Sequence, residues 1–162
     1  MTLDCNEILL DRLWVGRFVR SKDVEQLTQM GVTAVISLQS DDDLVMYNVH
    51  LNKLLEACSE AGIKLRRIAV PDFDEEAMAA DLEQSVAELE AALTPNWAKV
   101  YLHCTAGINR APTVAAAYLI RAMGFSAQQA YDFVVDRRHC NPYLAVLENY
   151  EASLKSARRE NI

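Results

Sequence analysis

Short apolar runs alternate with longer helix-like runs along the whole chain, and this alternation limits the folds open to it. The short runs are typical of strands and span residues 8–10, 13–15, 32–38, 63–70 and 99–103. The longer runs are typical of helices and span residues 21–31, 48–61, 74–93, 110–123, 126–138 and the segment after 142. Strands that alternate with helices favour a mainly parallel sheet with helices on both faces. The sequence therefore predicts an α/β fold.

Two of the expected helices have clear signatures. The segment 74–93 has an apolar face whose residues recur at helical spacings, namely Leu82, Val86, Leu89 and Leu93. The segment 110–123 is apolar on nearly all sides, so we expect it to lie buried at the centre of the domain. Gly124 follows that segment, in the position that favours a C-terminal cap.

Length and charge limit the kind of protein further. The chain has 162 residues, of which 51% are apolar, and we expect one folded domain over residues 1–162. Its 16 Lys and Arg residues against 23 Asp and Glu residues give a formal net charge of −7. Nucleic-acid binders and membrane-surface proteins need positive patches, so this balance argues against both kinds of partner. We expect the domain to act as a monomer.

Other features of the sequence bear on its compartment and on metals. The longest nearly apolar run, residues 111–120, is far shorter than the roughly 18 residues of a membrane span. The start of the chain, MTLDCNEILL, shows no signal peptide. The cysteines are Cys5, Cys58, Cys104 and Cys140. Because they form no CxxC pair or Cys/His cluster, we expect reduced thiols, no zinc, no cofactor and a cytoplasmic location.

The most specific chemical signal is the segment from His103 to Arg110, HCTAGINR, a Cys-x5-Arg loop between an expected strand and an expected helix. Successive backbone N–H groups of such a loop can point into one concavity and, with the helix N-terminus, bind an anion. The residues that would supply these groups are Thr105, Ala106, Gly107, Ile108 and Asn109. Arg110 adds a planar guanidinium that can grip two phosphate oxygens. The segment therefore predicts a phosphate-binding cup.

Cys104 lies at the base of this cup, where positive groups stabilise a thiolate and can lower a thiol pKa from about 8.5 to roughly 3.5–7.5. A phosphate ester also needs a proton donor for its leaving oxygen, above all when that oxygen is an alkoxide. The candidates are Asp72 and Asp74, which follow an expected strand. Asp74 also fits as the N-cap of the next helix, so we assign the acid to Asp72.

These residues resemble the signature HCxxGxxR of cysteine-dependent phosphatases, in their dual-specificity branch. An acid loop precedes the cysteine in that branch, as Asp72 precedes Cys104 here by 32 residues. The resemblance covers nearly the whole chain and implies a single-domain fold like that of protein tyrosine phosphatases. It implies that Cys104 is the nucleophile, Arg110 the phosphate clamp, and Asp72 the acid and then the base. His103 would support the thiolate through its hydrogen bonds.

A finer resemblance is to plant starch phosphatases and laforin, which dephosphorylate α-glucans. The matching segments are Leu38-Gln39 followed by Tyr47, Asp72-Phe73-Asp74, HCTAG followed by Arg110-Ala111-Pro112, and Arg137-Arg138 followed by Cys140-x-Pro142. This family holds sugar chains with aromatic residues around the cup, which implies glycan contacts for Tyr47, Phe73 and Tyr143. The substrate implied by the resemblance is a phosphorylated glucan.

The chain departs from that pattern at three positions. Asn109 stands where the family has glycine, although Asn tolerates the left-handed conformation well. Met46 stands where the family usually carries a second aromatic residue. Ala111 lacks the hydroxyl that common dual-specificity enzymes place after the arginine and that is thought to help the intermediate break down. We therefore expect a slow second step.

Other functions fit the same loop. A phosphatase for phospho-Ser, phospho-Thr or phospho-Tyr in proteins is the nearest alternative, because the sequence separates it poorly from a glucan phosphatase. The pair Asn109-Arg110 is similar to RNA 5′-triphosphatases, but the net charge argues against RNA. A phosphate-binding pseudoenzyme would lack the nucleophile, the clamp or the acid, and all three are present. Cys58 or Cys140 could be a redox partner of Cys104, at a distance that the sequence does not define.

Overall fold

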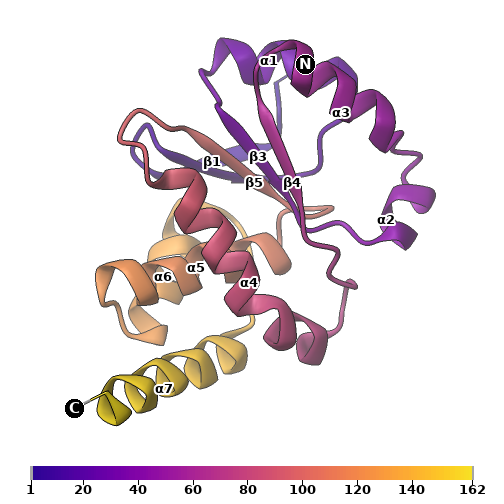
Figure 1. Ribbon diagram of the computed structural model, residues 1–162. Helices are drawn as coiled ribbons and strands as arrows, with labels where there is room; N and C mark the ends of the chain where they lie inside the picture. Colours follow the sequence, from indigo (N-terminus) through magenta and orange to yellow (C-terminus); the bar gives the residue numbers. More distant parts are fainter. Residues whose placement is uncertain (1, 162) are drawn as a thin grey trace.

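The computed structural model, which describes residues 2–161, is built around one five-stranded sheet (Figure 1). Its strands lie in the order β1 (Cys5–Leu9), β2 (Leu13–Gly16), β5 (Val100–His103), β3 (Ala34–Ser37) and β4 (Lys64–Arg67). The strands from β2 to β4 in this order are parallel, and β1 pairs antiparallel with β2 at one edge. This arrangement confirms the expected mainly parallel sheet.

Helices cover both faces of the sheet (Figure 1). One face carries a smaller core under the 3-10 turn Ser21–Asp23, α1 (Val24–Gln29) and α3 (Leu51–Glu60). The other face carries a larger core under α4 (Glu75–Leu93), α5 (Arg110–Met123), α6 (Ala127–Arg137) and α7 (Leu144–Glu160). Among residues 2–161, no helix combines the length and the apolar character that a membrane crossing requires.

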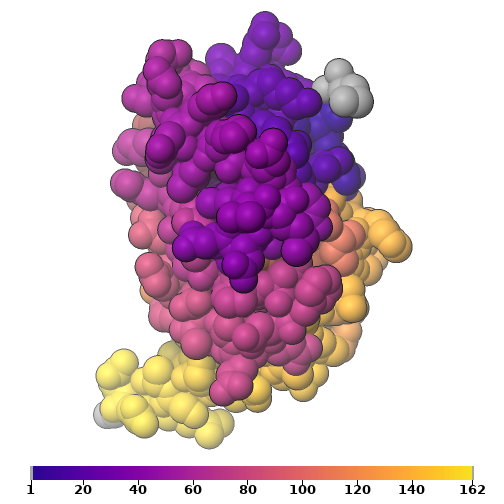
Figure 2. Space-filling model, turned by 90° about the vertical axis from the view of Figure 1, so that its right-hand side faces the viewer, coloured from indigo at the N-terminus to yellow at the C-terminus, as the bar shows by residue number. Residues whose placement is uncertain are grey.

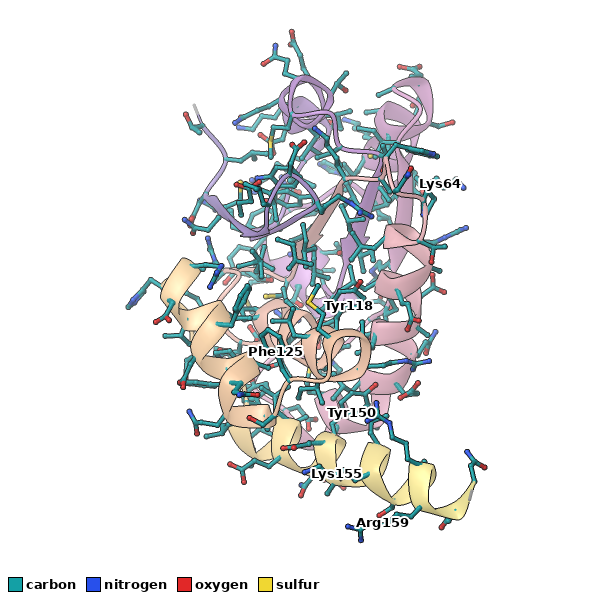
Figure 3. The ribbon with its side chains drawn as sticks, turned by 90° about the vertical axis from the view of Figure 1, so that its left-hand side faces the viewer. Lys64, Tyr118, Phe125, Tyr150, Lys155 and Arg159 are labelled. Atoms are coloured by element: carbon teal, nitrogen blue, oxygen red, sulfur yellow. The ribbon has the colours of Figure 1, made fainter. Side chains whose placement is uncertain are left out.

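α5 is the central helix of the larger core, as its nearly all-apolar sequence predicts. Ten of its residues are buried, and it packs against α4, α6 and α7. α7 is also tied to α4, because the Tyr150 hydroxyl donates a hydrogen bond to Glu83 at 3.0 Å. The last turns of α7, which carry the exposed Lys155 and Arg159, project from the body of the molecule (Figures 2 and 3).

Several helix ends lie where the sequence predicts them. Gly124 ends α5 in the left-handed conformation, with φ 71°. Ser126 and Gln129 form a capping box at the start of α6, within the run 126–138 that the sequence predicts to be helical. Asp74 caps α4, because its side chain accepts a hydrogen bond from the Ala77 N–H at 2.9 Å. These local signals therefore set the limits of three helices.

The sequence did not predict α2 (Asp41–Met46), a short helix between β3 and α3. Ser40 begins it with a capping box in which the Ser40 hydroxyl accepts from the Asp43 N–H and the Asp43 carboxylate accepts from the Ser40 N–H. The turn that follows α2 includes Asn48, which has φ 51°, so the helix expected at 48–61 begins only at Leu51, the start of α3.

The parallel strands end at one level, which brings four loops together. Gly16, His103, Ser37 and Arg67 are register partners across β2, β5, β3 and β4. The segments that follow these residues therefore meet at the carboxyl edge of the sheet, where open α/β sheets bind ligands. The Cys-x5-Arg loop follows β5, between β2 and β3 in the sheet, so it lies in the middle of this edge.

Candidate active site

A cavity of about 200 Å³ lies at the carboxyl edge of the sheet, against the Cys-x5-Arg loop. The residues that line it are Asp72, Phe73, Cys104, Ala106, Ile108, Asn109 and Arg110. Cys104 is only 2% exposed, so its contact with solvent is through this cavity. The structure therefore brings together the residues expected to be the nucleophile, the clamp and the acid.

The other loop residues hold the loop in shape. Gly107 has φ +70°, and a Cβ atom there would lie 2.6 Å from the backbone of Gly16, so only glycine fits. Thr105 is tied to the end of β3, because its hydroxyl accepts a hydrogen bond from the Gln39 amide at 3.1 Å. Asn109 has φ −115°, so its position does not require the left-handed conformation that the comparison with a family glycine suggested.

Arg110 is anchored through one of its terminal nitrogens. Nη1 donates to the Asp43 carboxylate at 2.6 Å, and to the carbonyl oxygens of Val70 at 2.7 Å and Leu38 at 3.4 Å. Nη2 lies 3.1 Å from Oδ2 of Asp72, and the buried Nε has no hydrogen-bond partner among the described residues. Because Nη1 is fully engaged, the Nε–Nη2 edge is the part of the guanidinium that can bind two phosphate oxygens.

Asp43, in the first turn of α2, is a functional candidate that the sequence reasoning missed. Its buried carboxylate accepts hydrogen bonds from Arg110 and from the N–H and hydroxyl of Ser40, at 2.8 and 3.0 Å. Burial acts to raise the pKa of Asp43, but the Arg110 and Ser40 hydrogen bonds outweigh burial and hold the pKa below its usual value. Asp43 therefore stays ionised and fixes Arg110. The pattern Ser40-x-x-Asp43, close to a capping box, is the signal that could have revealed it.

The two candidate acids occupy different environments. Asp72 lines the cavity and contacts Arg110, and 27% of its side chain is exposed. Asp74 caps α4 and lies outside the cavity lining. Phe73, between them, adopts a left-handed conformation with φ 56°, and its N–H donates to Oδ1 of Asp72 at 3.0 Å. This sharp turn separates the two carboxylates and leaves Asp72 as the one at the cavity.

His103 contacts Cys104, the expected nucleophile, through its backbone. Its Nδ1 lies 2.8 Å from the carbonyl oxygen of Cys104, and its Nε2 has no partner among the described residues. Burial lowers the pKa of His103 from 6.5 to about 4, so the ring is neutral near pH 7 and donates its Nδ1 proton to the carbonyl. His103 therefore holds the Cys104 backbone and adds no positive charge beside the thiol.

The residues expected to contact a glycan are placed differently. Phe73 lines the cavity and is 86% exposed. Tyr47 follows α2, outside the cavity lining, and packs against Phe18 with 5.5 Å between ring centroids. Tyr143 has a buried hydroxyl with no partner among the described residues, and burial together with the Asp72 carboxylate raises the pKa of Tyr143. Phe73 is thus the one of these three aromatic residues that lines the cavity.

The cysteines outside the loop differ in their relation to Cys104. All four are free thiols. Cys58 belongs to the core under α1 and α3, on the other face of the sheet from the core that contains Cys104. Cys140 packs against the same core as Cys104, and burial raises the pKa of Cys140 to about 11. A redox partnership with Cys104 stays a prediction, and of the two candidates Cys140 is on the appropriate face.

A thiol, a guanidinium edge and a carboxylate around one cavity, on this fold, form the arrangement expected of the catalytic domain of a cysteine-dependent phosphatase. The family described as the dual specificity phosphatase catalytic domain matches residues 13–157. The chain therefore belongs to that family, which confirms the resemblance of its sequence.

Individual relatives agree with this assignment. The "Phosphoglucan phosphatase DSP4, amyloplastic" of Castanea sativa is 30% identical over 142 residues, which cover 87% of this chain and 38% of that protein. The "Dual specificity protein phosphatase 8" of Mus musculus is 38% identical over 96 residues, which cover 57% of this chain and 14% of that protein. The solved structure of PTPMT1 shares the fold, with a TM-score of 0.79 at 20% identity over 96% of this chain and 99% of that one. The chain thus spans less than two fifths of the length of these two curated relatives.

The buried neutral His103 predicts a loss of stability in acid. Below pH 6.5 the unfolded chain takes up a proton on this ring that the folded protein does not take up until about pH 4. The free energy of unfolding should therefore decrease as the pH is lowered from 6.5 to 4, by up to about 1.4 kcal/mol per pH unit from this group. Urea unfolding at several pH values checks this, and His103→Asn, which keeps a donor near the Nδ1 position, should show a shallower slope.

The matched control is His139→Asn, since His139 is exposed. In this variant, the slope of the free energy of unfolding against pH should equal that of the unchanged protein. An unchanged slope in His103→Asn would show that His103 is not buried in its neutral form.

Proposed function

We propose that this chain is a phosphomonoester hydrolase that needs no metal ion and acts through a cysteinyl-phosphate intermediate. One observation carries the proposal: the Nε–Nη2 edge of Arg110 and the Asp72 carboxylate meet at the cavity in which Cys104 lies. Arg110 and the loop amides would hold a phosphoryl group there, with the thiolate on one side of phosphorus and Asp72 on the leaving-group side.

In the first step, Sγ of Cys104 forms a bond to phosphorus while the bond from phosphorus to the leaving oxygen breaks. Asp72 gives its proton to that oxygen, so the leaving group departs as an alcohol. The contact between Asp72 and Nη2 of Arg110 places this carboxyl group beside the guanidinium edge that would hold the phosphoryl group. A bound phosphate would compete for Nη2 and so free the carboxyl group to face the leaving oxygen.

In the second step, a water molecule attacks the phosphorus atom of the cysteinyl-phosphate. The Asp72 carboxylate takes a proton from this water, the S–P bond breaks, and the Cys104 thiolate and inorganic phosphate are released. Ala111, fully buried at the second position of α5, offers no hydroxyl to the departing thiolate. The second step is therefore the slower one in this proposal.

A phosphorylated α-glucan is the substrate that the surroundings of the cavity suit best. Phe73 at the cavity is 86% exposed, and Val45 and Met46 at the end of α2 are 81% and 74% exposed. α2 and the start of α4 lie next to each other on one face of the molecule (Figure 2). Exposed apolar side chains suit the faces of neutral sugar rings, and a net charge of −7 disfavours polyanions. The relative named as a phosphoglucan phosphatase supports the same substrate.

The second candidate is a protein phosphatase, which the 38% identity to a relative named as a dual specificity protein phosphatase favours. The apolar side chains around the cavity would then contact residues that flank a phosphorylated side chain. A monomer, a cytoplasmic location and the absence of nucleic-acid and membrane partners complete the proposal. The acidic net charge supports the last of these.

Asp72→Asn should separate alkyl from aryl substrates. The loss of the acid should lower kcat on an alkyl phosphate by about 10²–10⁴-fold, and lower it much less on p-nitrophenyl phosphate, whose leaving group needs no proton. The matched control is Asp74→Asn, because Asn also caps helices well and Asp74 caps α4. Equal losses on both substrates, or an alkyl-specific loss in Asp74→Asn, would remove Asp72 from the acid role.

The protein should release phosphate faster from phosphorylated amylopectin than from phosphopeptides. Phe73→Ala should lower kcat/KM on the glucan by about tenfold and change p-nitrophenyl phosphate hydrolysis little, because the lost ring contact is with sugar. Leu10→Ala is a matched control, since Leu10 is equally exposed at 86% but lies in the β1–β2 turn, at the other end of β2. Preference for phosphopeptides would instead identify a protein phosphatase.

A further inference from the structure

The segment that follows α6 lies against the outer side of the Cys-x5-Arg loop. Arg138, only 4% exposed, donates from Nε to the carbonyl oxygen of Gly107 at 2.8 Å and from Nη2 to that of Ala106 at 3.0 Å. The Asn141 N–H donates to the next carbonyl oxygen, that of Ile108, at 2.8 Å. Three successive carbonyl groups of the loop are thus bound by residues 138–141, and we call this segment the loop brace.

The direction of these carbonyl groups determines the direction of the amides. In a trans peptide the C=O and the N–H point opposite ways, so an outward carbonyl at Ala106 turns the Gly107 N–H inward. The same holds for the next two peptides, which turn the N–H groups of Ile108 and Asn109 toward the cavity. The loop brace therefore fixes the orientation of three of the amides that a phosphate would need.

Arg138 also brings a buried positive charge to the back of the loop. Its Nη1 donates to Asn6 at 2.9 Å and to the Asp4 carboxylate at 3.1 Å. The Asp4 side chain is 64% exposed, whereas that of Arg138 is 3% exposed. Water screens the exposed carboxylate more than the buried guanidinium, so Asp4 neutralises Arg138 only in part.

We propose that Arg138 is a positioning residue for phosphate, which holds the loop carbonyls outward and adds positive potential behind the loop amides. The inference rests on the proposed function, because it concerns the same phosphate site. It also assigns a role to the N-terminal segment, whose Asp4 and Asn6 hold the far side of the guanidinium. The neighbouring Arg137 differs from Arg138: among residues 2–161, its side chain stacks on the Phe133 ring and donates to the Phe133 carbonyl oxygen, and makes no hydrogen bond to the loop.

Binding of inorganic phosphate tests this proposal without turnover. Calorimetry would compare Arg138→Met, Arg138→Lys and the control Arg137→Met, each in a Cys104→Ser background that cannot form the intermediate. Arg138→Met should weaken phosphate binding by about tenfold or more, the scale of one charge-assisted hydrogen bond. Arg138→Lys keeps the charge but not the planar guanidinium, so its phosphate affinity should lie between those of Arg138→Met and the Cys104→Ser parent. Arg137→Met should bind phosphate as tightly as that parent.

In the active protein, KM for p-nitrophenyl phosphate should rise in Arg138→Met in step with the loss of phosphate affinity. A purely structural role would instead lower the melting temperature and leave the phosphate affinity of the folded protein unchanged, and that result would overturn the proposal. Should Arg138→Met not fold, Asp4→Asn provides the test, because it keeps a hydrogen-bond acceptor and removes only the opposing charge. Asp4→Asn should tighten phosphate binding by about twofold, and weaker or unchanged binding would contradict the electrostatic role.

These outcomes are separate from those of the proposed function. If the unchanged protein hydrolyses no phosphate ester but the Arg138 variants lose phosphate affinity as stated, the positioning role of Arg138 is supported and the hydrolase proposal is contradicted. If the unchanged protein is active and Arg138→Met binds phosphate as tightly as the parent, only the positioning role of Arg138 is contradicted.

Discussion

The buried ion pair between Arg110 and Asp43 is the interaction on which the site depends. The two side chains are almost fully buried, with 2.6 Å between Nη1 and Oδ2, and removing one partner of such a pair typically costs about 3–5 kcal/mol. Nη1 also binds the carbonyl groups of Leu38, just after β3, and Val70, beyond β4. One guanidinium thus joins α2, α5 and the segments that follow two strands. Its Nε–Nη2 edge, which the proposed function assigns to phosphate, faces the cavity only while these elements are in place.

The net charge of −7 does not oppose anion binding, because most acidic side chains lie away from the cavity. Residues 71–98 contain eight acidic residues and no Lys or Arg, and only Asp72 of these lines the cavity. Glu83 and Glu90 on α4 pair instead with Arg121 on α5. The loop has its own positive groups: its amides, the start of α5, Arg110 in the cavity and the buried Arg138 guanidinium behind the loop.

The sequence predicted what depends on local signals and on strand order. The limits of α5, the caps of α4 and α6 and the parallel sheet follow from periodicity, capping residues and alternation. The meeting of Cys104, Arg110 and Asp72 follows because parallel strands end at one edge. The sequence also predicted that Asp74 caps the helix and Asp72 does not, and in the structure Asp74 caps α4 while Asp72 lines the cavity.

What the sequence did not predict depends on contacts between distant residues. α2 has only six residues, and its carboxylate Asp43 is held by Arg110, which lies 67 residues away in the chain. Arg138 meets Asp4 across 134 residues, a pairing with no local pattern. The role of His103 was only partly foreseen, because its hydrogen bond goes to a backbone carbonyl and burial keeps it neutral.

Direct detection of the intermediate is the sharpest test of catalysis by Cys104. The protein would be acid-quenched during turnover of p-nitrophenyl phosphate, and the peptide that contains Cys104 analysed by mass spectrometry. A phosphoryl group on the Cys104 sulfur, abundant because Ala111 cannot assist its hydrolysis, is the predicted result. A phosphoryl group on another residue, or undiminished turnover in Cys104→Ser, would contradict it.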